Sequence, residues 1–405
     1  MTQIDAAWGA GASAGYEQLA ERFRPLFARI RQGAIHREIH RELPFEQIQW
    51  LKDSGFTALR VPTEYGGSGI SLPELFNLLI ELGEADSNLV QAIRGHMGFV
   101  EGLLTSSNTA RRERWLPRVA KGELIGPAWS EVGDAKQTDF GTRVQHENDH
   151  WVLNGSKFYT TGSLYADWID VGVSTPDGKG GGALINRQGA GVTVLDDWNG
   201  FGQTLTASGT AYFDNVRVEL PDLELESKFL YATGFFQLFH FAALAGIGRA
   251  LSGEVAQHVA SRKRTYSTGN GPRAALDPQI LQVVGQLRGA AYTSGAIVLK
   301  NAEALQRAYD SRHLDEAAVL HANAIAELEV AQSQTVIIDL ILNASTRLFD
   351  ALGASATLQP LALDRFWRNA RTLSSHNPRI YKDRIVGDFA VNGTLPPYQW
   401  RIGVA

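Results

Sequence analysis

Three short stretches of the chain gather side chains that could do chemistry. Gly95-His96-Met97-Gly98 sets a histidine between glycines in a helical stretch, which suggests close packing against something flat. Phe158-Tyr159-Thr160-Thr161-Gly162-Ser163 places hydroxyls and aromatic rings at the end of a strand, where they could hold the carbonyl edge of a planar ring. Arg371–Pro378 ends a helical region, and His376 within it could act as an acid or a base near neutral pH.

Each stretch also has an ordinary structural explanation. The local sequence around His96 favours a buried, hydrogen-bonded histidine at a helix-packing site. A threonine-rich strand face is common, and His376 could be a cation that faces the C-terminal dipole of its helix. No short spacing links the three stretches, so the residues alone do not assemble a site.

The residues disfavour several other kinds of site. His36 and His40 have i, i+4 spacing, but no Glu follows as in His-Glu-x-x-His, and their charged neighbours indicate a solvated face, so no metal site is expected. No Gly-x-Gly-x-x-Gly lies between a strand and a helix, and no Walker loop or Gly-x-Ser-x-Gly elbow occurs. A net charge of −5 argues against nucleic acid, and no run of 18 apolar residues predicts a membrane span.

The elements that must position these stretches begin as helices. Apolar residues recur at helical spacing through the first third of the chain. Ser71 and Glu74 form a capping-box pattern that opens one of these helices. The predicted helices are Tyr16–Gln32, Pro44–Ser54, Ser71–Ala85, Ser87–Thr105 and Thr109–Lys121.

The sequence pattern changes near Glu123, where the apolar segments become short and are separated by turn residues. Asn154-Gly155 predicts a hairpin turn, Pro176-Asp177-Gly178 predicts a second turn, and glycines 178–182 predict a hairpin tip. The predicted strands are Trp151–Leu153, Trp168–Ser174, Ala183–Asn186, Val192–Leu195 and Ala211–Val218. Long helices follow from about Phe229, with candidates at Tyr231–Tyr266, Asp277–Tyr309 and Leu314–Leu352.

Runs of helices, then strands, then helices exclude an alternating β-α fold. We therefore predict an α+β, mainly α protein with three domains: a helical domain at 1–123, an antiparallel β domain at 124–222 and a helical bundle at 223–405. Long bundle helices usually need apolar partners, so an oligomer is expected. Met1–Gly15 lacks a basic start followed by an apolar block, so we expect no secretory signal and a cytoplasmic enzyme.

Sulfur-containing residues are scarce in the 405-residue chain, which has 0 cysteines and 2 methionines. This removes disulfides, thiolate metal sites and cysteine nucleophiles. One explanation is selection for a protein that can be made when sulfur is short, which would suit a role in scavenging sulfur from organic compounds. The other is compositional drift. Because Met97 adjoins His96, we expect it near any active site.

At these places the chain resembles the acyl-CoA dehydrogenase family. The shared motifs are Val61–Gly69, Trp129-Ser130-Glu131 and Lys157–Thr161. Within that fold the chain is closer to the flavin monooxygenase branch typified by dibenzothiophene monooxygenase, with Asp364–Thr372 followed by His376-Asn377-Pro378 as the strongest local match. The resemblance runs roughly from Tyr16 to the end. It implies a helical N-terminal domain, a central β barrel, a C-terminal four-helix bundle and a homotetramer.

The resemblance also implies where a flavin would bind, between the β domain and the bundle. The residues that match its ring-binding segments are Trp129, Ser130, Phe158, Thr160 and Thr161. Arg264 falls where the fold places a phosphate-binding arginine, and Gly353, Ala354 and Ser355 fall where a neighbouring subunit closes on the nucleotide. The residues that match those proposed to surround the reactive flavin position are His96, Ser163 and His376.

One departure from the family bears on the activity. Acyl-CoA dehydrogenases generally use a carboxylate to take the substrate's α-proton, and the two places where the family carries it read Leu373–Asn377 and Gly234–His240 here, without an acid. Without that base, dehydrogenation of a thioester has no obvious proton acceptor.

The resemblance therefore implies a two-component monooxygenase. A separate reductase would supply reduced flavin, FMN rather than FAD, and O2 would add to form a C4a-hydroperoxyflavin that oxygenates a small organosulfur compound for sulfur assimilation. His96 and His376 would hydrogen-bond or protonate the peroxide, and Ser163 would support the flavin's N5 side. Three alternatives stay open: an FAD-dependent acyl-CoA dehydrogenase or oxidase, an N-hydroxylating monooxygenase of the same fold, and an inactive flavin-binding member.

Overall fold

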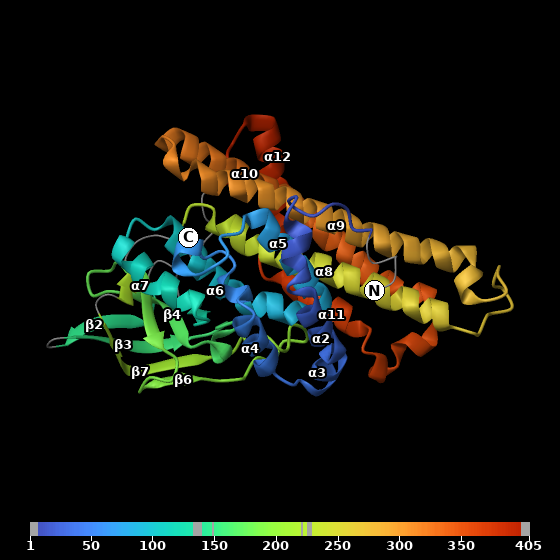
Figure 1. Cartoon of the computed structure of the whole chain (residues 1–405), viewed down its shortest axis with the longest axis horizontal. Helices are drawn as coiled ribbons and strands as arrows, with labels where there is room; N and C mark the ends of the chain where they lie inside the picture. The colour runs from blue at the N-terminus through green and yellow to red at the C-terminus, as the bar shows by residue number, and fades with distance from the viewer. Residues whose placement is uncertain (1–6, 133–139, 148–149, 220–221, 225–228, 398–405) are drawn as a thin grey trace.

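The computed structural model describes residues 7–132, 140–147, 150–219, 222–224 and 229–397. It confirms a mainly helical protein in which helices precede and follow a central sheet (Figure 1). The N-terminal helices are α1 (Tyr16–Glu21), α2 (Arg24–Gln32), α3 (Ala34–His40), α4 (Phe45–Asp53), α5 (Leu72–Ala85), α6 (Ser87–Thr105) and α7 (Thr109–Ala120).

Local sequence explains where these helices begin. The capping box opens α5 as predicted, because the Ser71 hydroxyl accepts from Glu74 N–H while the Glu74 carboxylate accepts from Ser71 N–H at 2.8 Å. Asp86 caps α6 by accepting from Asn88 N–H at 3.1 Å. The predicted continuous helix Tyr16–Gln32 is wrong. The chain breaks after Glu21 and restarts as α2 with Pro25 in its first turn, where a missing N–H costs nothing.

The central strands form one mixed sheet of order β6-β7-β3-β2-β4-β5-β8, with β1 paired to β4 off this path. The strands are β1 (Ile125–Ala128), β2 (Arg143–Glu147), β3 (His150–Lys157), β4 (Trp168–Ser174), β5 (Gly180–Asn186), β6 (Val192–Val194), β7 (Ala211–Val218) and β8 (Leu223–Glu224). The predicted antiparallel barrel needs correction on both counts. β1 and β2 pair with β4 in parallel, and β6 and β8 stay at the two ends of the described order, so the sheet is open.

Asn154-Gly155 is not the predicted hairpin turn. Both residues lie inside β3, where the register against β7 shifts between Leu153 and Gly155. Gly155 has a φ of 145°, and a Cβ there would lie 2.6 Å from the Cα of Thr142. The glycine therefore serves a bulge and a close backbone approach rather than a turn. The predicted turn at Pro176-Asp177-Gly178 does join β4 to β5.

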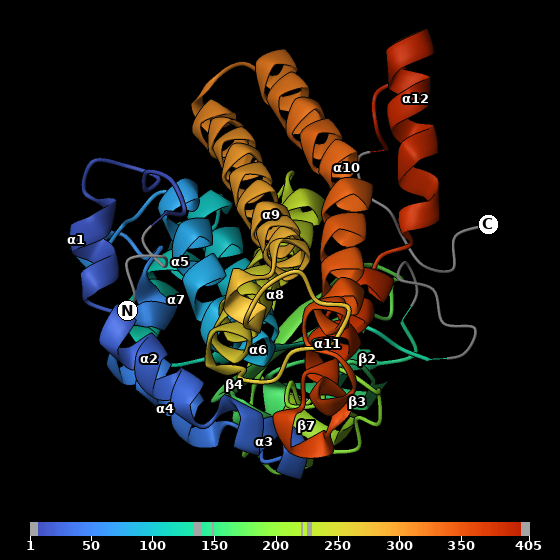
Figure 2. The same ribbon diagram turned by 90° about the vertical axis from the view of Figure 1, so that its right-hand side faces the viewer.

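The C-terminal helices are α8 (Ala232–Ser261), α9 (Pro278–Asp310), α10 (Glu316–Arg347), α11 (Asp364–Ser375) and α12 (Lys382–Asn392). α8 packs against α9, α10 and α11, and these four helices form a bundle. Figure 2 shows one end of α9 and of α10 projecting beyond the rest of the molecule, with α12 beside α10. α8 is long and apolar enough to span a membrane by composition, but 89% of its most apolar window is buried inside the molecule. Its position at the centre of the bundle accounts for that hydrophobicity.

Candidate active site

A cavity of about 1070 Å³ lies where the sheet meets α6, α8 and α11. Its wall on the sheet side begins at Trp129 and Ser130, directly after β1. Trp129 Nε1 donates to Asp170 Oδ2 at 2.7 Å, which fixes the indole, and Ser130 pairs with Phe158 through an isolated bridge. Two of the residues that the resemblance assigns to a flavin ring therefore face the cavity.

A cluster of hydroxyl groups continues this wall. Thr161 Oγ1 lies 2.7 Å from Ser208 Oγ, and that hydroxyl lies 2.7 Å from Thr206 Oγ1. All three residues line the cavity. Thr161 is also a residue assigned by the resemblance, whereas Thr206 and Ser208 come from a loop that the sequence reading did not single out. The cluster offers donors and acceptors to the edge of a planar ligand.

Backbone strain gathers at the same wall. Tyr159, Gln203 and Ala207 have φ values of 59°, 51° and 48°, in the left-handed region that non-glycine residues rarely adopt. Tyr159 and Gln203 line the cavity, and Ala207 separates Thr206 from Ser208. Such conformations persist only where the surroundings impose them, and they cluster at functional sites.

Phe158, Thr160 and Ser163 lie near this wall but are absent from the cavity lining. Thr160 Oγ1 donates to Gly209 O at 2.9 Å, and Ser163 Oγ donates to Pro127 O at 2.8 Å. Both hydroxyls are buried, so here they tie the wall's segments together. Any role for Phe158, Thr160 or Ser163 on a bound flavin stays a prediction.

The opposite wall is built from one face of α6. Its lining residues recur at helical spacing: Gln91, Arg94, Gly95, Gly98, Phe99 and Gly102. A Cβ at Gly95 would lie 2.4 Å from the Pro127 ring, and one at Gly98 would lie 2.1 Å from Phe236. The two glycines therefore let β1 and α8 approach α6 closely, as the flat-packing interpretation of this stretch anticipated.

His96 points to the other side of α6 and is fully buried. Its Nε2 lies 2.9 Å from Thr57 O, and its Nδ1 accepts from Ile125 N–H at 3.1 Å. These partners require a neutral ring with the proton on Nε2, and burial lowers the pKa of His96 to about 4. The ring thus joins α6 to β1 and to the 56–58 turn, which matches the ordinary structural explanation. Its catalytic assignment stays a prediction.

Met97 does not lie at the cavity, contrary to our expectation. It is buried in the large helical core and is absent from the cavity lining. The periodicity of α6 explains this, because residues 96 and 97 face away from the side that carries 95 and 98. Its position beside His96 is a matter of packing.

His376 does line the cavity, at the C-terminal end of α11. Arg94 Nη2 lies 3.3 Å from His376 Nε2, and His376 Nδ1 lies 3.0 Å from Asn377 Oδ1. Because arginine can only donate, Nε2 must accept and the proton sits on Nδ1. Asn377 Nδ2 donates onward to Gln237 Oε1, so a directed chain of donors runs from α6 through α11 to α8.

His376 is held neutral by this setting. Burial and the nearby charge of Arg94 lower its pKa to about 4. The ring of His240 on α8 lies 4.4 Å away, centroid to centroid, and neither of its nitrogens has a hydrogen-bond partner. Burial lowers the pKa of His240 too, so the two neighbouring rings, tilted by 41° to each other, are both uncharged at neutral pH.

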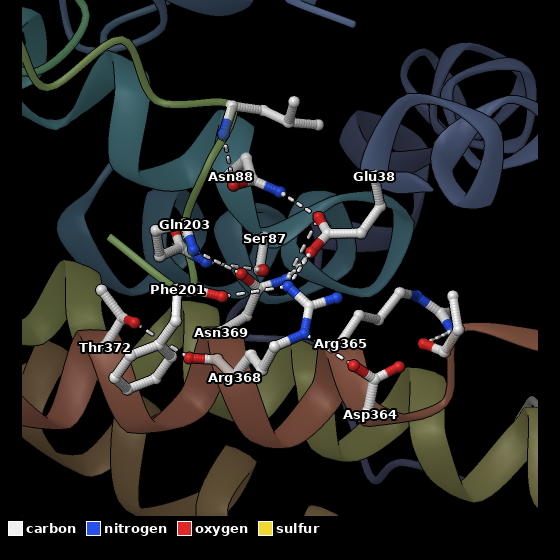
Figure 3. Close-up of polar contacts among 12 residues, drawn as sticks. Glu38, Ser87, Asn88, Phe201, Gln203, Asp364, Arg365, Arg368, Asn369 and Thr372 are labelled. Atoms are coloured by element: carbon white, nitrogen blue, oxygen red, sulfur yellow. Dashed lines mark hydrogen bonds and ion pairs between the residues drawn. The ribbon is translucent and has the colours of Figure 1, made fainter. Parts of the chain in front are cut away.

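The 364–372 motif is joined by polar contacts to α3 and to the 201–208 loop (Figure 3). Arg368 Nη1 donates to Glu38 Oε1 at 3.0 Å and to Phe201 O at 3.0 Å. Asn369 Nδ2 lies 3.4 Å from the same carboxylate, and its Oδ1 accepts from Gln203 N–H. Phe201 and Gln203 line the cavity, so the motif fixes the strained 201–208 loop to α3 and α11.

Arg264 and Gly353, Ala354 and Ser355 do not reach this cavity. They lie in the connections that follow α8 and α10, where Arg262 Nη1 donates to Leu352 O at 2.8 Å. The resemblance places a neighbouring subunit at Gly353–Ser355, and a single chain does not test that arrangement. These four assignments stay predictions.

The carboxylates that line the cavity already have partners. Asp170 accepts from Trp129, and Glu224 Oε2 lies 3.5 Å from Arg111 Nε. Glu327 is a buried acid in contact with the α8 position where the family can carry its base, and burial raises its pKa to about 7. It accepts from Gly234 N–H and is absent from the lining. Across the described residues, no cluster of three His, Asp or Glu side chains could hold a metal.

Known proteins identify the class. A family model for the N-terminal domain of acyl-CoA dehydrogenases matches residues 15–123, and one for their C-terminal domain matches residues 238–378. The chain belongs to the acyl-CoA dehydrogenase family. The probable FMNH2-dependent monooxygenase SfnC of Pseudomonas putida is 27% identical over 386 residues, which cover 92% of this chain and 94% of SfnC.

Two solved structures share the whole fold. FMN-bound TdsC, a dibenzothiophene monooxygenase of Paenibacillus sp. A11-2, superposes with a TM-score of 0.86 at 26% identity, covering 94% of this chain and 99% of TdsC. The methanesulfinate monooxygenase MsuC of Pseudomonas fluorescens has a TM-score of 0.85 at 26% identity, with 94% and 98% covered. The resemblance to the monooxygenase branch is confirmed.

Proposed function

We propose that the protein is a monooxygenase that uses reduced FMN and O2 to oxygenate a small organosulfur compound. The observation that carries the proposal is the cavity itself. It pairs a polar wall suited to a planar ring with a helical wall that offers the neutral His376 and the guanidinium of Arg94, and the carboxylates among its lining residues already have partners. SfnC is named as an FMNH2-dependent monooxygenase, and the structure of TdsC was solved with FMN bound.

The residues present fit a flavin ring. Trp129 and Ser130 at the end of β1 and the Thr161–Ser208–Thr206 hydroxyl cluster form one continuous wall. Gln203 adds a side-chain oxygen that has no hydrogen-bond partner, as expected for a group awaiting a ligand. At about 1070 Å³ the cavity stands at the upper end of ligand-pocket sizes of roughly 300–1,000 Å³, which leaves room for a substrate beside the ring.

Bound reduced FMN would supply two electrons and two protons, so that one atom of O2 bonds to the substrate sulfur and the other leaves as water. The chain's own residues do the rest. The Arg94–His376–Asn377 chain presents a neutral imidazole and a fixed guanidinium to the cavity. The aromatic side chains of Phe229, Phe236 and Phe99 on the lining limit water, which favours oxygen transfer over loss of peroxide.

Further parts of the proposal concern the protein's setting. A separate reductase supplies the reduced flavin, because no dinucleotide-binding Gly-x-Gly-x-x-Gly lies between a strand and a helix. A role in sulfur assimilation fits a chain with 0 cysteines and 2 methionines. The exposed apolar residues Ile380 and Val391, on and beside the projecting α12, support assembly of several copies, and we retain a cytoplasmic homotetramer as the expected form.

An acyl-CoA dehydrogenase is the second candidate, favoured only by family membership. It would need a base, and Glu327 is committed to the start of α8 outside the cavity. Nitrogen oxygenation would use the same site and differs only in substrate.

Anaerobic titration separates the monooxygenase from the acyl-CoA dehydrogenase. Protein loaded with FMN or FAD is mixed with a medium-chain acyl-CoA, and the flavin absorbance is followed. We expect tighter binding of FMN and no bleaching by acyl-CoA. Preference for FAD together with rapid bleaching would overturn the proposal and establish the dehydrogenase.

A further inference from the structure

Arg94 is the one cavity-lining cation that has no carboxylate partner in the described part of the chain. Its guanidinium lies 3.3 Å from the neutral His376 and 5.3 Å from the Phe236 ring centroid, and its Nε makes no hydrogen bond. The other lining arginine, Arg111, is paired with Glu224. Burial lowers the pKa of Arg94 to about 10, which leaves it charged at neutral pH.

A charge without a counter-ion in a partly desolvated site is costly, and an anionic ligand at Arg94 would offset that cost. The surroundings of Arg94 leave room for that ligand. The cavity has a volume of about 1070 Å³, and Gln91, three residues earlier on the same face of α6, lines it beside Arg94. Phe236 and Phe229 also line the cavity, and their rings supply an apolar surface against which a short hydrocarbon group can pack.

We propose that Arg94 binds an anionic group of the substrate, so that the enzyme acts on a small organosulfur oxyanion rather than on a neutral sulfur heterocycle. This inference rests on the proposed function and narrows it. The relatives leave the choice open, because TdsC is named for a neutral aromatic compound and MsuC for a sulfinate. A guanidinium offers two parallel N–H donors to a pair of oxygens on one atom, which is the shape of a sulfinate or a carboxylate.

A sulfinate would satisfy both requirements of the site. Its two oxygens carry the charge that Arg94 completes, while its sulfur keeps a lone pair that can bond to oxygen. One atom of O2 would add there to give a sulfonate, and the other would leave as water with the two electrons and two protons of reduced FMN. A thioether that carries a carboxylate meets the same description, with the sulfoxide as product.

Binding can be measured without turnover. Enzyme loaded with oxidised FMN is titrated calorimetrically with ethanesulfonate and with its neutral isostere ethyl methyl sulfone, and the wild type is compared with Arg94→Gln, Arg94→Lys and the control Arg217→Gln. Arg217 lies on β7 and pairs with Glu219, both exposed and outside the cavity lining. We expect the wild type to prefer the sulfonate, Arg94→Gln to weaken its binding about 10- to 100-fold, Arg94→Lys to retain part of the preference, and Arg217→Gln to change nothing.

The inference fails if the wild type shows no preference for the sulfonate or if Arg94→Gln keeps the preference. It also fails if Arg94→Gln weakens only the binding of FMN, because Arg94 would then serve the cofactor. Oxygenation of ethanesulfinate, of a carboxylated thioether and of ethyl methyl sulfide tests the proposed function separately. Oxygenation of the neutral sulfide without sulfonate binding would leave the function standing and remove the anion site. Arg94-dependent sulfonate binding without any oxygenation would establish the anion site and overturn the proposed function.

Discussion

Replacing His96 by Leu tests whether this histidine is chiefly a structural link. The change removes the partners of Thr57 O and Ile125 N–H while the site stays buried. Each of the two orphaned backbone groups costs about 1–3 kcal/mol, so we expect a loss of about 2–6 kcal/mol in the free energy of unfolding. His240→Leu is the matched control, because His240 is equally buried but has no hydrogen bond to lose, and we expect little or no loss there.

The pH dependence of the free energy of unfolding provides a second test of the role of His96. Folded His96 has a pKa of about 4, against the ordinary value of 6.5, so below pH 6.5 the unfolded chain takes up a proton that the folded chain refuses. The free energy of unfolding should therefore fall as the pH drops from 6.5 toward 4, by up to about 3 kcal/mol from this residue at 1.36 kcal/mol per unit. His240 adds to the fall in the same direction.

Urea denaturation between pH 4 and 7 measures both effects. We expect His96→Leu to lose stability at pH 7 and to show a shallower pH slope than the wild type. Unchanged stability at pH 7, together with complete loss of product formation by folded enzyme, would refute the reasoning and restore His96 to the chemistry.

Three further outcomes follow from the site and its supports. His376→Ala should keep FMN affinity within a few-fold but divert oxygen to free peroxide, measured as the ratio of peroxide to product, and an unchanged ratio would remove His376 from the mechanism. Gly162→Ala should destabilise the fold and weaken FMN binding at Thr161, because Gly162 has a φ of 82° and its Cβ would lie 2.0 Å from Ala92 O; thermal melting and FMN titration check this. Glu101→Ala should cost about 3–5 kcal/mol by chemical denaturation, because it strips Arg60 and Tyr231 of their buried partner; a loss below 1 kcal/mol would contradict it.

Periodicity and capping predicted most of the long helices, but not the break between α1 and α2 or the short α3. Ser87–Thr105 was predicted with its observed bounds, and the structure adds the cap that Asp86 supplies at its start. Trp168–Ser174 and Ala211–Val218 were likewise found as strands. The sheet's order and its parallel pairings could not be read, because they depend on contacts between strands far apart in sequence. Asn154-Gly155 misled for the same reason, since the demand for glycine comes from Thr142 across the sheet.

The site was only partly visible in the sequence. Trp129, Ser130, Thr161 and His376 were named through the resemblance and line the cavity. Arg94 was missed, although a signal was present. It shares a helical face with Gly95 and Gly98, and no acidic residue lies three or four positions away to pair with it.

Gln203, Thr206 and Ser208 gave no such signal. Their role arises where the 201–208 loop is held against α11 by Asn369, a contact between residues 166 positions apart.

Oxygen transfer from labelled O2 tests the central claim most directly. The enzyme is supplied with FMN, a flavin reductase and NADH under ¹⁸O2, with ethanesulfinate and ethyl methyl sulfide offered in separate reactions, and the products are analysed by mass spectrometry. The account predicts one ¹⁸O atom in the oxidised sulfur product, formed only when the enzyme is present. Products that carry oxygen from water, or the same yield when catalase removes free peroxide and the enzyme is omitted, would contradict it.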